Sequence, residues 1–257
     1  MTDMNQPIGL STFRLRRRTP GSFLMVPCPQ QQRSIRCQGQ LEGIAATILI
    51  ACPTVAHIQE QPLTIWYRWH EKGDSLDIQL LESAPENRPK NRPNAGVSYI
   101  VPDFLVEMKD GHKRLVEIKA SSRPAKPITQ RKLAVARQFA AVEAWTFHLV
   151  TETELHREPL LANVRLVSRY RQTQTDSALL QDLELLVCEQ GTSLVDLSRS
   201  IPQPGLAQVR MHIFHLLATG RLTFDPRKDT IGDQTLIYPK GVITWDPFDS
   251  VWAPSGC

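Results

Sequence analysis

The fold of this chain is decided by residues 99–120, which read YIVPDFLVEMKDGHKRLVEIKA. Two apolar segments in this stretch, Tyr99–Glu107 and Leu115–Ala120, are rich in residues that favour strands. Between them, Lys109–His112 contains an Asp-Gly pair, which is typical of a tight turn. We therefore expect a β-hairpin.

Three charged side chains belong to the expected hairpin. Asp103 precedes Glu117 by 117 − 103 = 14 residues, so the hairpin brings it against Glu117 and Lys119. Glu117 and Lys119 share one face, because side chains alternate along a strand. Carboxylate oxygens suit a hard divalent cation such as Mg²⁺. The metal would neutralise charge developing on a phosphate and lower the pKa of a bound water, while Lys119 would orient that water or stabilise the phosphorane.

The alternative is that these charges form only a solvated ion-pair surface. Apolar residues surround each of them, however: Ile100, Val101, Phe104, Val116 and Ile118. Charges on buried strands are costly unless they are paired or bound to a metal. We therefore favour an active site over a solvated surface.

The spacing Pro102-Asp103 … Glu117-Ile118-Lys119 is similar to the PD-(D/E)xK nuclease signature. The resemblance implies an α/β restriction-endonuclease-like domain, in which a carboxylate from the preceding helix usually completes the site. Glu42 is the candidate for this third carboxylate, because it is the only acid in the helix expected from Gln40. Glu60 competes with it but lies in an expected strand beside Gln61-Pro62.

Patterns elsewhere divide the chain into four parts. Residues 1–38 read as an irregular basic arm, and residues 39–171 as the nuclease domain, with a helix at Ile128–Val142, a strand at Trp145–Val150 and a helix at Leu160–Tyr170. Three apolar-faced helices and two short strands in residues 177–240 fit an α+β winged-helix domain. Residues 241–257 read as an extended tail. Candidate DNA-binding residues are Arg14, Arg16, Arg17 and Arg18 in the arm, with Arg123 and Lys126 after the hairpin.

The distribution of charge separates the front of the chain from the back. Residues 1–170 carry 23 − 16 = +7 and residues 171–257 carry 7 − 10 = −3. The front is suited to a polyanion, and the back favours a protein partner over bare DNA. The five cysteines form no C-x-x-C, and the longest apolar run is too interrupted to span a bilayer, so we expect neither a disulfide framework nor a membrane segment.

With these residues in hand, the chain resembles the TnsA family, the endonuclease subunits of heteromeric (Tn7-like) transposases. The resemblance rests on Glu42, Gln61-Pro62, Pro102-Asp103-Phe104, Glu117-Ile118-Lys119, and Val150-Thr151-Glu152 before the helix with Asn163. It implies that Glu42, Asp103 and Lys119 are catalytic, and that Glu117 occupies a metal-site position that is Gln in some members. Glu42, Asp103 and Glu117 are then the expected metal ligands, for Mg²⁺ or for Mn²⁺ as a substitute.

The resemblance also implies a function and partners. The chain would cut the 5′ strands of double-stranded DNA at transposon ends, while a TnsB-like DDE transposase cuts the 3′ strands. Its C-terminal part would dock on a TnsC-like AAA+ ATPase. We expect a bacterial, cytoplasmic and nucleoid-associated protein with no membrane partner.

Two other functions remain open from the sequence. The chain could be a stand-alone restriction-type or junction-resolving nuclease with an appended winged helix, in which case the isolated chain would be active. It could also be a catalytically silent DNA-binding adaptor. The retained Asp103, Glu117 and Lys119 argue against the adaptor.

Overall fold

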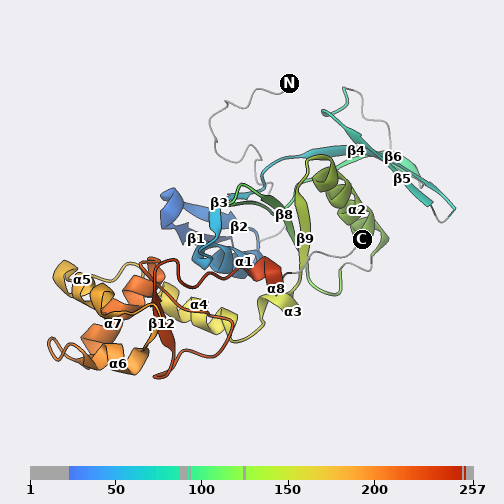
Figure 1. Ribbon diagram of the computed structural model, residues 1–257. Coiled ribbons are helices and arrows are strands. Elements are labelled where there is room, and N and C mark those ends of the chain that lie inside the picture. Colours follow the sequence, from blue (N-terminus) through green and yellow to red (C-terminus); the bar gives the residue numbers. More distant parts are fainter. Residues whose placement is uncertain are drawn as a thin grey trace. The chain divides into compact units, whose positions relative to one another are not determined.

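The computed structural model describes residues 23–73, 75–86, 92, 94–123, 126–250 and 252. The chain forms two compact units (Figure 1). The first takes in Val55–Glu154, the preceding residues up to Ala46 and, late in the chain, Trp252; the second comprises Thr47–Thr54 and Leu155–Val251. The predicted arm arginines Arg14, Arg16, Arg17 and Arg18 lie outside the described residues. No helix in the described ranges is long and apolar enough to cross a bilayer.

A four-stranded sheet in the order β3-β7-β8-β9 forms the centre of the first unit. Its neighbours pair antiparallel except for β8 and β9, which are parallel. Phe104, Val106, Leu115 and Val116 on the two middle strands are fully buried. The β7–β8 pair confirms the predicted hairpin, and Gly111 in its turn has φ 86°. The four strands are β3 (Val55–Glu60), β7 (Phe104–Met108), β8 (Lys113–Ile118) and β9 (Thr146–Val150).

A second sheet of the first unit has the order β5-β4-β6. Alternate residues of β4, namely Ile65, Tyr67 and Trp69, are buried in one core with residues of helix α2. The opposite residues of β4 are exposed or half-buried. The elements are β4 (Ile65–Lys72), β5 (Ser75–Leu81), β6 (Ala95–Ile100) and α2 (Pro127–Val142).

The expectation of one continuous strand over Tyr99–Glu107 is wrong. Strand β6 ends at Ile100 in the three-stranded sheet, and β7 begins at Phe104 in the four-stranded sheet. Pro102 lies in the break, and proline has no N–H to offer a ladder. The chain therefore changes sheets at the residues that contain Asp103.

The expectation that residues 1–38 are irregular is also wrong for residues 23–38, which the structure describes. Strands β1 (Leu24–Cys28) and β2 (Arg33–Cys37) pair antiparallel across a short 3-10 turn, η1 (Pro29–Gln31). Ile35 and Cys37 are fully buried, so the hairpin contributes to the core. The first helix, α1 (Gln40–Ala51), follows directly. A Cβ at Gly43 would lie 2.8 Å from Leu24 Cδ1, so this helix position has room only for glycine unless Leu24 moves.

The second unit contains the helices and strands predicted for residues 177–240. Their apolar faces meet in one core that includes Leu183, Leu197, Val209 and Ile237, all fully buried. Beyond the prediction, a third short strand joins the sheet, whose order is β10-β12-β11. The elements are α5 (Ser177–Leu186), β10 (Thr192–Ser193), α6 (Leu194–Arg199), α7 (Leu206–Ala218), β11 (Leu222–Thr223) and β12 (Leu236–Pro239).

The boundary between the units differs from the expected break at residues 172–176. The division falls within the short helix α3 (Glu152–Leu155), which was not predicted, and places helix α4 (Leu160–Ser168) in the second unit. Val167 of α4 belongs to the core of that unit. The Asn163 side chain accepts from the Ile231 N–H and donates to the carbonyls of Pro226 and Asp229.

The expectation that residues 241–257 form an extended tail is wrong for the residues that the structure describes. A short helix, α8 (Pro247–Ser250), lies within it. Trp245 and Phe248 are buried in the second unit, and Trp252 is 1% exposed in the first. In the first unit His148 Nδ1 lies 2.7 Å from the Trp252 carbonyl oxygen, so this late segment is fixed to β9.

Candidate active site

Asp103, Glu117 and Lys119 lie together, as the hairpin predicts. Lys119 Nζ is 2.6 Å from Glu117 Oε1 and 3.4 Å from Asp103 Oδ2. The Asp103 and Glu117 side chains are 15% and 14% exposed, and that of Lys119 is 28% exposed. The three groups are therefore mostly removed from water but remain partly accessible to it.

The backbone fixes each of these residues from a different strand end. The Lys119 N–H donates to the Val150 carbonyl at 3.0 Å, which extends the parallel β8–β9 ladder by one residue. The Ile118 N–H donates to Asp103 Oδ2 at 2.7 Å. The Asp103 carbonyl accepts from the Gln61 N–H at 2.9 Å, and Gln61 is held at φ 46°, a left-handed conformation that is uncommon for a side-chain-bearing residue.

Glu42 approaches this group from the first turn of α1. Its Oε2 accepts from the Gln38 N–H at 2.6 Å. Burial, and next the negative charge of Asp103, raise the pKa of Glu42 to about 7. The attraction of Lys119 opposes this rise. Glu42 therefore shares its electrostatic environment with Asp103 and Lys119, and its role as the third carboxylate stays a prediction.

The cluster has more negative than positive charge. Burial, and next the Asp103 charge, raise the pKa of Glu117 to about 7 despite its contact with Lys119. Burial alone would lower the pKa of Lys119, but the Asp103 and Glu117 carboxylates outweigh it and raise the pKa above its usual value. With every group ionised, three carboxylates face one ammonium. This imbalance is the property that a bound cation would correct.

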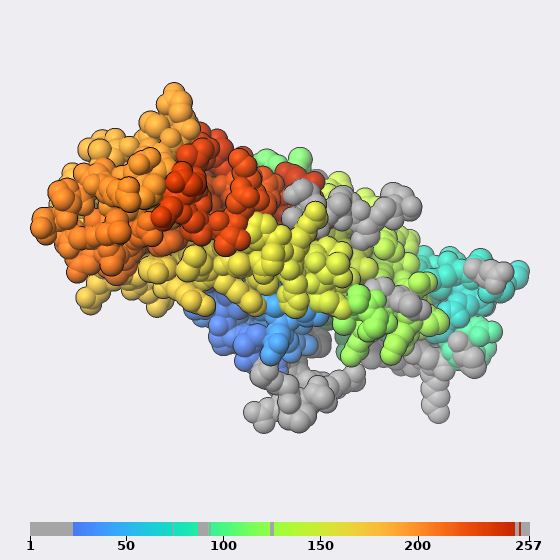
Figure 2. Space-filling model, turned by 90° about the horizontal axis from the view of Figure 1, so that it is seen from below, coloured from blue at the N-terminus to red at the C-terminus, as the bar shows by residue number. Residues whose placement is uncertain are grey.

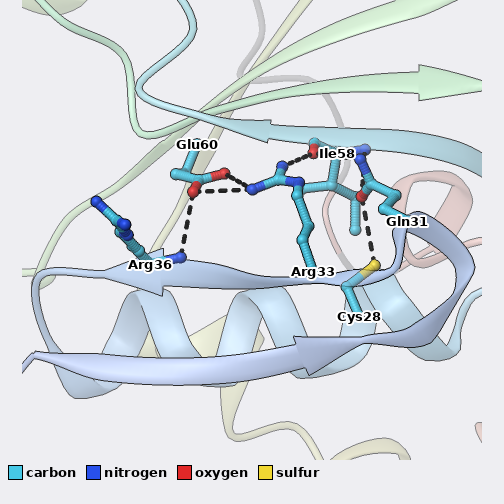
Figure 3. Close-up of polar contacts among 6 residues, drawn as sticks. All are labelled: Cys28, Gln31, Arg33, Arg36, Ile58 and Glu60. Carbon is cyan, nitrogen blue, oxygen red and sulfur yellow. Dashed lines mark hydrogen bonds and ion pairs between the residues drawn. The ribbon is translucent and has the colours of Figure 1, made fainter. Parts of the chain in front are cut away.

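Glu60, the competing carboxylate, has its charge balanced by another residue. Arg33 Nη1 donates to both of its carboxylate oxygens, at 2.9 and 2.7 Å, and the Arg36 N–H donates to Oε1 at 3.3 Å (Figure 3). Arg33 Nη2 also donates to the Ile58 carbonyl at 2.6 Å. Figure 3 shows the Arg33 and Glu60 side chains pointing at each other between β2 and β3. The structure thus favours Glu42 over Glu60 as the third acidic group of the site.

Sequence reasoning assigned no structural role to two residues near the cluster, Cys37 and Glu152. Cys37 is fully buried, and burial together with the charges of Glu42, Glu60 and Asp103 raises its pKa to about 12, so it is an unreactive thiol. Glu152 accepts from Ser121 through both the N–H at 2.7 Å and the hydroxyl at 2.6 Å, and so fixes the segment that follows Lys119. Neither contact has a local sequence signal, because the partners are distant in the chain.

The predicted DNA-binding residues after the hairpin are exposed but take no part in the cluster. Arg123 lies in the turn after Lys119, where its N–H donates to the Ala120 carbonyl. Lys126 is the residue just before the first turn of α2. Neither contacts Asp103, Glu117 or Lys119 in any described hydrogen bond or ion pair, so their predicted role stays a prediction.

The donor chemistry of the cluster fits a hard divalent cation, although its groups are not arranged as a closed cage. Among the described residues, no group of three or more His, Cys, Asp or Glu side chains has the geometry to hold a metal ion. Lys119 Nζ lies between the Asp103 and Glu117 carboxylates instead. The carboxylate oxygens and their uncompensated charge are nevertheless what Mg²⁺ prefers.

Comparison with known proteins agrees with this geometry. Residues 52–152 match the family model described as TnsA-like endonuclease N terminal. The matched stretch contains all of β3 to β9 and the cluster residues Asp103, Glu117 and Lys119, whereas Glu42 precedes it. A search of the curated proteins found no match. Residues 52–152 are therefore identified as a domain similar to the N-terminal domain of TnsA-like endonucleases.

Proposed function

We propose that this protein is the metal-dependent DNA endonuclease subunit of a Tn7-type transposase, and that it cuts the 5′ strands at the transposon ends. One observation carries the proposal: the TnsA-like domain contains Asp103, Glu117 and Lys119 in direct contact, with Glu42 beside them. A nuclease needs such a cluster, whereas an adaptor does not.

Glu42, Asp103 and Glu117 would hold the metal, Mg²⁺ or Mn²⁺. When bound, the metal would supply an activated water and neutralise charge that develops on the scissile phosphate. The chain itself holds Asp103 in place through the Ile118 and Gln61 N–H groups. Lys119 keeps its proton and presents a positive charge to the phosphate. In-line hydrolysis would leave 5′-phosphate and 3′-hydroxyl ends.

We further propose that the second unit is a winged-helix module that docks on a TnsC-like ATPase. The three helices α5, α6 and α7, together with the sheet β10-β12-β11, support the assignment of a winged-helix module. Its net negative charge supports docking on a protein partner, since residues 171–257 carry seven Lys/Arg against ten Asp/Glu. Such a surface repels a nucleic-acid backbone and favours a protein partner.

The test is a transposition reaction in which the Asp103→Ala variant replaces the parent chain and the TnsB-like and TnsC-like partners are present. The partner transposase would still cut and join the 3′ strands, and the uncut 5′ strands would keep the donor DNA attached. Sequencing of the products should show cointegrates instead of simple insertions. The control is Asp110→Ala, which changes an exposed aspartate in the β7–β8 turn and should give the normal products.

Simple insertions at the usual proportion with Asp103→Ala would overturn the proposal. Robust cleavage of duplex DNA by the isolated chain would favour a stand-alone nuclease. An unchanged product pattern in Asp103→Ala, Glu117→Ala and Lys119→Ala alike would indicate a silent adaptor.

A further inference from the structure

The three-stranded sheet has a solvent-facing side that the candidate active site does not use. We define the outer sheet face as the side of β5-β4-β6 opposite the α2 core. On β4 it presents Arg68, His70 and Lys72, which are all exposed, whereas Tyr67 and Trp69 between them are buried. The β4 and β5 segments reach the molecular surface (Figure 2, cyan). The alternation of strand side chains therefore places these basic residues in one row.

The neighbouring strands leave this row largely uncompensated. Arg68 lies opposite Gln79 on β5, and its Nη1 donates to Gln79 Oε1 at 3.3 Å. Lys72 lies opposite Ser75. Asp77, opposite His70, is the one acidic residue that β4, β5 and β6 contribute to the outer sheet face in these registers.

A further cation lies at the far end of the face. Arg92 is exposed, and its backbone bonds to that of Ala95, which lies opposite His70. Arg68, Lys72 and Arg92 together outnumber Asp77. Val97 on β6 is buried, so the open part of the outer sheet face is formed by β4 and β5.

The near end of the face leads to the candidate active site. Trp66 lies opposite Tyr99, and their rings are 4.9 Å apart at 45°. Tyr99 precedes Asp103 by only four residues, across the break between the two sheets. The start of β4 is thus the end of the sheet that is joined to Asp103. Arg68 lies nearer to this end than Lys72 does.

We propose that the outer sheet face binds the phosphate backbone of duplex DNA that flanks the bond to be cut; this rests on the proposed nuclease function. The distance from Arg68 to Lys72 along β4 is about 14 Å at about 3.4 Å per residue. That length corresponds to about four steps of one DNA strand. Long basic side chains at this spacing can each reach a phosphate, and contacts of this kind position a protein without reading sequence.

The same observations favour duplex over single-stranded DNA. A single-strand site typically offers aromatic rings on which bases stack. Here the two aromatic rings, Trp66 and Tyr99, are half-buried and packed on each other. Apart from Asp77, the exposed groups of the face are cationic and polar, which suits a phosphate backbone and not an apolar partner.

The experiment measures binding of the full chain to two duplexes in the presence of Ca²⁺: one that ends near the cleavage position and one that extends beyond it. The double variant Arg68→Gln/Lys72→Gln is compared with Lys109→Gln/Lys132→Gln, a control that likewise removes two exposed positive charges from the first unit. Loss of two phosphate contacts should flatten the slope of log K against log salt by about 1.8. When the salt concentration is raised from about 50 to about 200 mM, the affinity for the long duplex should fall in both proteins. The fall should be about 12-fold larger for the parent than for the Arg68/Lys72 variant.

The control variant should keep the parent's slope, and both variants should keep the parent's thermal melting temperature. Parallel slopes for the parent and the Arg68/Lys72 variant on the long duplex would overturn the inference, as would an effect confined to single-stranded DNA. These outcomes leave the proposed function intact. That function fails instead if the parent chain, with its partners present, neither binds nor cuts duplex DNA.

Discussion

Replacing Glu117 by Gln should make the metal-free protein more stable at pH 8. Burial and the charge of Asp103 raise the pKa of Glu117 from 4.5 to about 7. A group whose pKa is higher in the folded state binds its proton more tightly there, so folding is favoured at low pH and this stabilisation is lost as the pH rises through 7. Above pH 7 the folded state must hold a buried carboxylate that the unfolded chain leaves in water.

The shift sets the size of the effect. A difference of 2.5 pKa units corresponds to about 3 kcal/mol at 1.36 kcal/mol per unit. Gln has the shape of the protonated acid and avoids this cost. The variant should therefore exceed the parent by up to about 3 kcal/mol at pH 8, and the difference should vanish well below pH 4.5, where Glu117 is protonated in both the folded and the unfolded state. Adding Mg²⁺ should stabilise the parent more than the variant.

Urea unfolding in EDTA, followed by tryptophan fluorescence, measures this difference in the free energy of unfolding. The signal reports mainly the first unit, because four of the five tryptophans lie there: Trp66, Trp69, Trp145 and Trp252. Glu143→Gln is the control, since Glu143 is exposed at the end of α2. A Glu117→Gln variant that is less stable than the parent at pH 8, or a difference that does not change with pH, would refute the reasoning.

Two more substitutions test the surroundings of the site. Lys119→Met should stop DNA cleavage and, above pH 7, lower the free energy of unfolding, because Asp103 and Glu117 lose their cation; urea unfolding at pH 5 and pH 8 should show the larger loss at pH 8. Arg33→Ala should cost about 3 kcal/mol by leaving Glu60, 7% exposed, without its guanidinium partner. Adding Glu60→Gln should recover part of this loss in the same unfolding assay, and no recovery would contradict a charge-pair role.

The sequence predicted the structure correctly where the interacting residues are close to one another in the chain. The hairpin of β7 and β8 depends on two apolar runs and an Asp-Gly turn within a few residues, and strand alternation then places Glu117 and Lys119 side by side. Helix α2 and strand β9 followed from apolar periodicity in the same way. Glu42 was predicted from the resemblance to PD-(D/E)xK nucleases, as the one acid in the preceding helix, and its role stays a prediction.

Features that depend on distant partners could not be predicted. Pro102 marks the break between β6 and β7 locally, but the backbone position of Asp103 is fixed by the Gln61 N–H, which donates to the Asp103 carbonyl from 42 residues earlier in the chain (103 − 61). The hairpin of β1 and β2 was read as a basic arm because Arg33 looks like any surface arginine until Glu60 is placed beside it. Helix α4 was assigned to the wrong side of the boundary because its apolar face fits either core, and only contacts such as those of Val167 and Asn163 decide between them.

The position of Trp252 affects the order in which the protein can be completed during synthesis. The ribosome releases β9 about a hundred residues before Trp252, whose carbonyl lies 2.7 Å from the buried His148 ring. Until that residue emerges, the nascent nuclease sheet lacks a piece of its covering. Vectorial synthesis thus delays completion of the first unit until nearly all of the second unit has left the ribosome.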